Sequence, residues 1–116
     1  MMKEGVTQMN RQAFVSRLRA WAARADHETI ESRGTARVTW RGQANVLHAV
    51  ANVAVGGVQD QNTPKMLRLQ IIADRQKTLG IWDRETDEEK AAEYTGMVQG
   101  YDLILELLKD ATEHWD

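Results

Sequence analysis

The residues best suited to recognise a ligand are the arginines between positions 33 and 41. Arg33, Arg37 and Arg41 recur at every fourth position. A helix would place all three on one face, whereas a strand would place Arg37 and Arg41 beside Thr35 and Thr39. Both geometries present a row of cations, which a protein needs to displace the counterions condensed on duplex DNA. The predicted nucleic-acid-binding residues are Arg33, Arg37, Thr39, Arg41, Arg17 and Arg24.

Charge is divided unevenly along the chain. Residues 1–80 contain twelve Lys/Arg and six Asp/Glu, a net charge of +6, whereas residues 81–116 contain three and eleven, a net charge of −8. This asymmetry favours a basic face that binds a polyanion or an acidic protein. A second interpretation is that the arginines pair with the acidic C-terminal helix, within or between subunits, because the whole chain has a net charge of −2.

Residues that catalyse reactions or hold metals are few and scattered. None of His27, His48 and His114 has a second histidine three or four positions away, as a helical metal site would require. The residues next to Ser16 and Ser32 in the sequence match no pattern typical of a serine nucleophile. The chain has no cysteine, no phosphate-binding loop and no dinucleotide fingerprint. We therefore predict a protein that is not an enzyme and uses no metal or other cofactor.

An acidic cluster at positions 87–93 has two interpretations. Asp87, Glu88, Glu89 and Glu93 could together bind a divalent cation. A helix start explains the cluster more simply, because Thr86 and Glu89 have the spacing of a capping box and acids suit the positive end of a helix dipole. The cluster therefore predicts where the last helix begins.

Apolar residues at helical spacing predict four helices in a single domain over residues 1–116. These helices are predicted at 11–33, 43–55, 64–79 and 87–113. Gly34 should end the first helix, with Arg33 in its last turn, and Gly80 should end the third. Thr63 and Pro64 should open the third helix as its cap and first residue.

Residues 35–41 fit two structures. Ala36, Val38 and Trp40 alternate with polar residues between two glycines, which is typical of a strand. Trp40 also extends the apolar stripe of the following helix backward. The predicted fold class is therefore all-α with four helices, and a short strand at 35–41 stays open as an alternative.

Self-association is expected from the apolar surface of the last helix, which exceeds what one neighbouring helix would cover. Gly96 and Gly100 lie one turn apart and would let another backbone approach closely. A lone strand at 35–41 would also need an edge with which to pair. We expect a dimer or larger ring. Its predicted interface residues are Trp40, Gly96, Gly100, Tyr101 and Leu105.

Residues 65–83 resemble a segment common in bacteriophage small terminase subunits. In this segment, a helix with apolar residues leads to the basic residue Lys77. Leu79-Gly80 and the large apolar residue Ile81 then follow. In that family the segment lies in a helical oligomerisation region. The resemblance implies a ring-forming subunit that recognises viral DNA and passes it to the packaging motor.

A second resemblance is to ribbon-helix-helix regulators, whose chain forms one strand and then two helices. Here the matching segments are the possible strand at 35–41 and the predicted helices at 43–55 and 64–79. In that family two strands pair across a dimer and insert alternate polar side chains into the major groove. The resemblance implies that the strand at 35–41 contacts DNA. The side chains on its DNA-facing side would be Thr35, Arg37, Thr39 and Arg41.

Two functions are consistent with these features. The first is a non-enzymatic, phage-type homo-oligomer that binds double-stranded DNA in packaging or recognition. The alternative is a helical protein-interaction module, either a virion assembly component or a small inhibitor or DNA mimic, which would use its acidic C-terminal helix on a phage or host protein. No apolar run approaches the roughly 20 residues of a membrane span, so we expect a cytoplasmic protein, in the host cytoplasm if phage-encoded.

Overall fold

Four helices make up the part of the chain that the computed structural model describes, residues 9–56, 63–111 and 115. They are α1 (Arg11–Glu31), α2 (Gly34–Val55), α3 (Pro64–Asp83) and α4 (Glu88–Leu108). No β-strand occurs among these residues, so the predicted all-α fold with four helices is confirmed. None of the described helices is long and apolar enough to cross a lipid bilayer.

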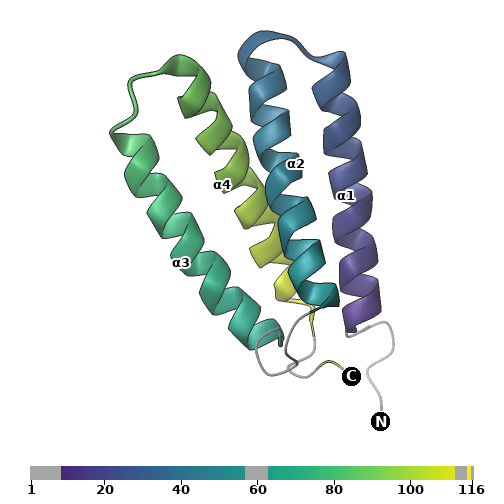
Figure 1. The fold of residues 1–116 in the computed structure, drawn as a ribbon. Helices are drawn as coiled ribbons and strands as arrows, with labels where there is room; N and C mark the ends of the chain where they lie inside the picture. The colour runs from purple at the N-terminus through teal and green to yellow at the C-terminus, as the bar shows by residue number, and fades with distance from the viewer. Residues whose placement is uncertain (1–8, 57–62, 112–114, 116) are drawn as a thin grey trace.

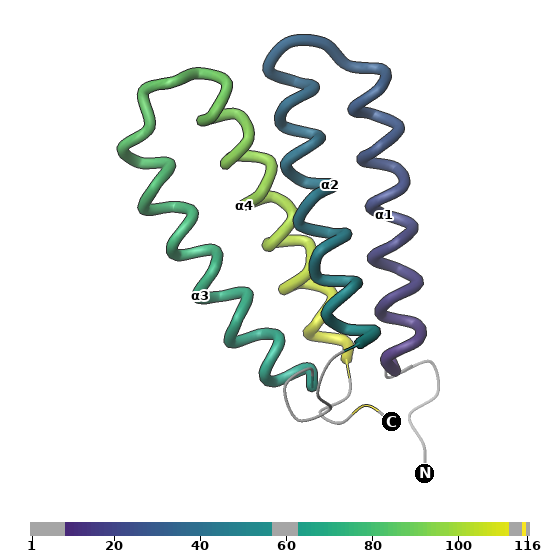
Figure 2. Tube along the Cα trace, in the orientation of Figure 1, coloured from purple at the N-terminus to yellow at the C-terminus, as the bar shows by residue number. Residues whose placement is uncertain are grey.

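The helices form two antiparallel hairpins, α1 with α2 and α3 with α4. The hairpins lie side by side in the spatial order α1, α2, α4, α3, so α2 and α4 are the inner helices (Figure 1). These two run in the same direction from the end that holds both short connections within the hairpins (Figure 2). At the opposite end, the N–H of Met9 donates to the carbonyl of Asp110 at 2.9 Å and ties the first helix to the last.

Residues 35–41 belong to α2, so the alternative prediction of a strand is wrong. Gly34 has a φ angle of 63°, a left-handed conformation that glycine adopts without strain, and it turns the chain from α1 into α2. Arg33 occupies the N-cap position of α2 rather than the last turn of α1. Helical geometry buries Val38 and Gly42, which lie four positions apart on one face.

The start of α3 follows the prediction and its end does not. Thr63 Oγ accepts a hydrogen bond from the N–H of Met66 at 3.3 Å, and Pro64 is the first helical residue. The helix then continues through Gly80 to Asp83. Gly80 does not stop it, because a glycine only weakens a helix unless the backbone also turns out of the helical region.

The N-cap of α4 is one residue later than predicted. Asp87 is the N-cap, and its Oδ1 accepts from the N–H groups of Glu89 and Lys90 at 2.9 and 3.0 Å. The capping box with Thr86 is therefore wrong, although the prediction that acids cap this helix is right. An aspartate is at least as good an N-cap as a threonine, so the neighbouring residue takes the position.

The end of α4 lies at Leu108, before the predicted end near 113. Beyond it, the N–H of Asp110 donates to the carbonyl of Leu107 at 3.0 Å, and the N–H of Ala111 donates to that of Leu108 at 3.2 Å. These bonds span three residues and tighten the final turn. Residues 57–62 and 112–114, with His114 among the latter, lie outside the described residues.

The two hairpins meet where glycines bring α2 and α4 into backbone contact. A methyl group added to Gly96 would overlap the carbonyl oxygen of Thr39 and lie 2.8 Å from its carbonyl carbon. A methyl group on Gly42 would overlap the carbonyl oxygen of Glu93, and one on Gly100 would lie 3.1 Å from the Val46 side chain. The expectation of a close backbone approach is thus correct, and the approaching backbone is α2 of the same chain.

The hydrophobic core lies mainly between α1, α2 and α4, and α3 adds only two side chains to it. Phe14, Leu18, Leu47 and Ile104 are completely buried near its centre. Trp115 covers one end of the core and packs against Phe14 with ring centroids 4.9 Å apart. The two residues from α3 are Leu67 and Ile71.

Candidate interaction surfaces

The predicted cationic row lies at the start of α2. Arg33, Arg37 and Arg41 are all exposed. Arg37 Nε donates to the carbonyl of Thr29 at 3.0 Å, and its Nη2 donates to the carbonyl of Ile30 at 3.5 Å. These carbonyls belong to the last turn of α1 and have no partner within that helix. Arg37 therefore stabilises the α1–α2 hairpin.

Three further arginines also donate to carbonyls at the ends of helices, so each described helix has an arginine at its C-terminal turn. Arg11 Nη1 donates to the carbonyl of Ala54 in α2 at 2.6 Å, and Arg68 Nη2 donates to that of Leu108 in α4 at 3.0 Å. Arg84 Nε donates to a carbonyl of its own helix, α3, at 3.3 Å. A cation is favourable there because the helix dipole is negative at that end. Much of the basic charge thus has a structural role.

The other predicted DNA-binding residues lie on the surface. Arg17, Arg24, Arg33 and Arg41 are exposed, and no carboxylate within the described residues lies within ion-pair distance of them. The guanidinium of Arg17 lies 6.0 Å from the ring centroid of Trp21. Thr39 Oγ donates to a carbonyl one turn earlier in α2, at 2.9 Å.

Only one ion pair within the described residues links the basic part of the chain to the acidic last helix. It joins Arg75 Nε of α3 to Asp102 Oδ1 of α4 at 2.6 Å. The pairing of the arginines at 33–41 with α4 does not occur among the described residues. Within the described residues, no group of three His, Cys, Asp or Glu side chains is placed to hold a metal ion. Asp87 caps α4, and Glu88 and Glu89 are exposed in its first turn.

The predicted oligomer-interface residues lie within the fold of one chain. Gly96 and Gly100 are buried against α2, and Tyr101 is buried in the core. Leu105 is half-buried against the core, and Trp40 is half-buried on α2. The glycine and tyrosine positions are thus already covered by the chain itself.

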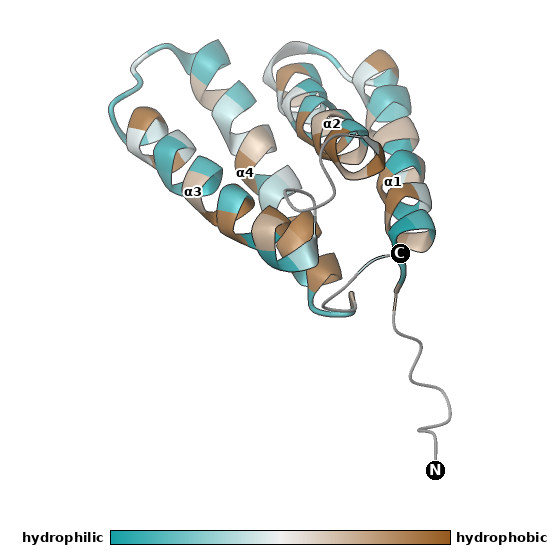
Figure 3. Ribbon diagram, turned by 60° about the horizontal axis from the view of Figure 1, so that its bottom comes forward, coloured by the Kyte–Doolittle hydropathy of each residue, from teal (hydrophilic) through white to brown (hydrophobic). Residues whose placement is uncertain are grey.

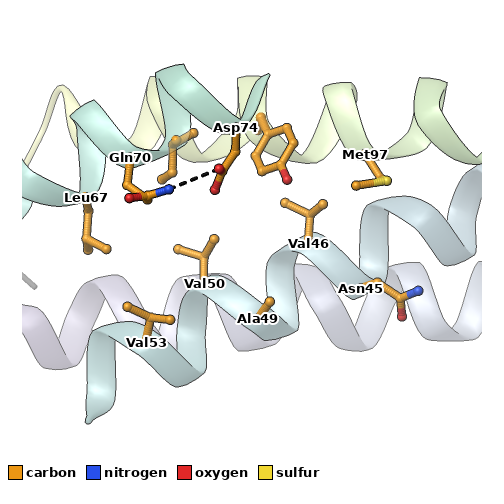
Figure 4. Close-up of a pocket in the computed structure, with 11 residues that line it drawn as sticks. Asn45, Val46, Ala49, Val50, Val53, Leu67, Gln70, Asp74 and Met97 are labelled. Carbon is orange, nitrogen blue, oxygen red and sulfur yellow. Dashed lines mark hydrogen bonds between the residues drawn. The ribbon is translucent and has the colours of Figure 1, made fainter. Parts of the chain in front are cut away.

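A groove between α2 and α3, with α4 as its floor, was not predicted from the sequence. Its volume is about 260 Å³ (Figure 4). The groove exists because α3 packs on α4 and diverges from α2. Its apolar lining consists of Val46, Ala49, Val50 and Val53 from α2, Leu67 and Ile71 from α3, and Met97 from α4.

Polar side chains also line this groove: Asn45 on the α2 side, Gln70 and Asp74 on the α3 side, and Tyr101 on the floor. Gln70 Nε2 donates to Asp74 Oδ1 at 3.0 Å, the dashed line in Figure 4. Burial raises the pKa of Tyr101 above its ordinary value of 10.0, and the charge of Asp74 raises it further, against the opposing effect of a hydrogen bond with Thr78. The phenol is therefore neutral at physiological pH. Asp74 is the only charged residue that lines the groove.

A second apolar surface lies on α3 itself. Of the eight large apolar side chains that are exposed in the described residues, five belong to α3: Met66, Leu69, Ile72, Ile81 and Trp82. Figure 3 shows hydrophobic segments recurring along this helix. A helix that is apolar on more than one face normally has more than one neighbour, and α3 packs mainly on α4. Apolar residues on several faces of this helix were the sequence signal for this surface.

Comparison with known proteins gives no match, whether with protein-family models, with curated proteins or with solved structures.

Proposed function

We propose that the protein is a non-enzymatic interaction module that binds an amphipathic helix of a partner protein in the α2–α3 groove. The observation that carries this proposal is an open apolar groove between two antiparallel helices with one carboxylate, Asp74, in its wall. Grooves of this kind receive the apolar face of a helix, whose residues at positions i, i+3 or i+4, and i+7 are the anchors. From Asn45 to Val53, the α2 wall extends about 12 Å, or two turns of such a helix.

The single charge in the groove specifies the partner's chemistry. Asp74 has no lysine or arginine within ion-pair distance in the described part of the chain. A partner helix that places one Lys or Arg beside its apolar face would supply that charge. The groove lining is mostly apolar, and its polar side chains are Asn45, Gln70, Asp74 and Tyr101. Such a lining suits the apolar face of a helix with polar groups at its edge.

The test uses a fluorescein-labelled amphipathic peptide of about 15 residues, near the length at which a helix forms alone. One peptide has a central lysine beside its leucine face, and the second has glutamate there. The lysine peptide should bind about tenfold more tightly, and Asp74→Ala should remove that preference. Ala49→Phe should block binding by filling the groove. Ala36→Phe, at an exposed position of α2 that does not line the groove, is the matched control.

Equal binding of the two peptides, unaffected by Ala49→Phe, would show that the groove does not bind helices in this way. Thermal unfolding of each variant by circular dichroism would verify that the substitutions leave the fold intact.

Duplex DNA binding by a homo-oligomer, as in phage packaging, is the second candidate. It is favoured by the exposure of Arg17, Arg24, Arg33 and Arg41 without carboxylate partners in the described residues. The test is fluorescence anisotropy of a labelled duplex at about 50 and 200 mM salt, a range over which several phosphate contacts lose most of their affinity. Steeply salt-dependent binding that weakens in Arg33→Ala and Arg41→Ala would support it. No binding at either salt concentration would eliminate it.

A further inference from the structure

A stripe of six residues along one side of α3 has the spacing of a coiled-coil seam. It consists of Lys65, Leu69, Ile72, Gln76, Leu79 and Asp83. The intervals alternate between four and three residues, which keeps all six on one line along a helix. The side chains of Leu69 and Ile72 are 56% and 42% exposed, and Leu79 is half-buried. The stripe is therefore a helix-packing surface that the fold leaves open.

This stripe is complementary to itself when one copy is reversed. In a single register, Lys65 lies opposite Asp83 of the second copy, and Leu69 lies opposite Leu79 of that copy. Ile72 then lies opposite Gln76. Each pair occurs twice, as a two-fold interface requires. We propose that α3 pairs in this antiparallel way with α3 of a second copy of this chain.

Charge selects this orientation. Lys65 and Asp83 stand at the two ends of the helix, about 27 Å apart, so they cannot pair within one chain. Neither has an ion-pair partner among the described residues. A parallel pairing would place lysine opposite lysine and aspartate opposite aspartate, which is unfavourable. The antiparallel arrangement converts both repulsions into attractions, and Gln76 in an otherwise apolar centre favours one register.

A hollow at the C-terminal end of the stripe fits the same register. It is lined by Gln76, Leu79, Gly80, Trp82 and Asp83. Because Leu79 lies opposite Leu69 and Asp83 lies opposite Lys65, the side chains of Lys65 and Leu69 of the second copy would lie over this hollow.

This pairing is independent of the proposed function. The groove is lined from α3 by Leu67, Gln70, Ile71 and Asp74, none of which belongs to the stripe. A dimer joined through the stripe therefore keeps both grooves open. The interface also differs from the predicted one, which consisted of Trp40 on α2 and Gly96, Gly100, Tyr101 and Leu105 on α4.

The test measures the molecular mass of the full chain by light scattering at about 1 to 100 µM, where a dimer with micromolar Kd dissociates. The wild type should be a dimer at the upper concentrations. Lys65→Glu and Asp83→Lys should each weaken the dimer about tenfold or more, because each places like charges opposite each other at two points. Both changes suit the helix dipole, so neither should destabilise the monomer.

Mixing the two variants should restore the dimer, because the mixed pair has opposite charges at both ends. The doubly substituted chain Lys65→Glu/Asp83→Lys should also dimerise as well as the wild type. Lys77→Glu, an identical change on α3 outside the stripe, is the control and should have no effect.

A wild type that stays monomeric at every concentration would overturn the pairing without affecting the peptide test of the groove. A dimer insensitive to both charge changes would place the interface elsewhere. A dimer that is weakened by the single changes but not restored by mixing or by the double change would refute the antiparallel register.

Discussion

Replacement of Gly96 by alanine is expected to destabilise the protein, although alanine is the better helix former. The added methyl group would overlap the carbonyl oxygen of Thr39 and lie 3.0 Å from the backbone nitrogen of Gln43. Both atoms belong to the backbone of α2, so a change of side-chain rotamer cannot relieve the overlap, and the two inner helices must separate. Overpacking of this kind costs about 1–3 kcal/mol, and the rigid partner places Gly96→Ala at or above the upper end.

The helix propensity of alanine offsets part of this cost, by about 1 kcal/mol. We therefore expect the free energy of unfolding to fall by about 2 kcal/mol in Gly96→Ala, which corresponds to a decrease in Tm of roughly 8 °C. The assay is urea unfolding followed by circular dichroism and tryptophan fluorescence.

The matched control is Gly80→Ala. Gly80 also lies inside a helix, but nothing lies within 4 Å of a methyl group added to it. The substitution should raise the free energy of unfolding by about 0.5–1 kcal/mol, because only the propensity term remains. A Gly96→Ala variant that is stabilised to the same extent would refute the backbone contact between α2 and α4.

Three further predictions concern single contacts. Arg37→Ala should lower the free energy of unfolding by about 1 kcal/mol, because it loses the hydrogen bonds to the last carbonyls of α1. Arg41→Ala is the control and should change this free energy by less than about 0.5 kcal/mol. Equal losses for the two variants in urea unfolding would contradict the capping role of Arg37. Trp115→Ala should cost about 3 kcal/mol in calorimetry because it removes the contact with Phe14, and a neutral result would mean that this tryptophan does not cover the core. The raised pKa of Tyr101 means that its contribution to stability is present below pH 10.0 and is lost as the pH rises through the folded-state pKa. Tyr101→Phe should therefore flatten the decline in stability above that pH, and an unchanged decline would exclude Tyr101 as its source.

The parts of the fold that the sequence predicts are those encoded by local signals. Thr63 and Pro64 mark the start of α3 because a cap and its helix are neighbours along the chain. The acids at 87–89 mark the start of α4 for the same reason, with an error of one residue. Residues 35–41 could not be assigned, because their alternation fits both a strand and a helix. The close contact of Gly96 with Thr39 forms when residues 35–41 are helical, and it joins residues far apart in sequence.

The candidate sites depended still more on distant contacts. A charge count reveals that arginines are abundant in the first part of the chain, but not that Arg11 reaches a carbonyl 43 positions away. The groove depends on the divergence of α3 from α2, which no local pattern encodes. The stripe from Lys65 to Asp83 could have been found from the sequence, because its spacing is regular, but only the structure shows that it is left uncovered.

The parallel contact between α2 and α4 has a consequence for the order of folding. Each hairpin closes a short loop, whereas this contact joins Thr39 to Gly96 across the whole of α3. Such distant contacts form late because closing a long loop costs more entropy. We therefore expect the hairpins to form first and to dock afterwards through the glycines. Substitutions at Gly96 should then accelerate unfolding far more than they slow refolding. The lifetime of the native state would thus depend on how closely two backbones approach each other.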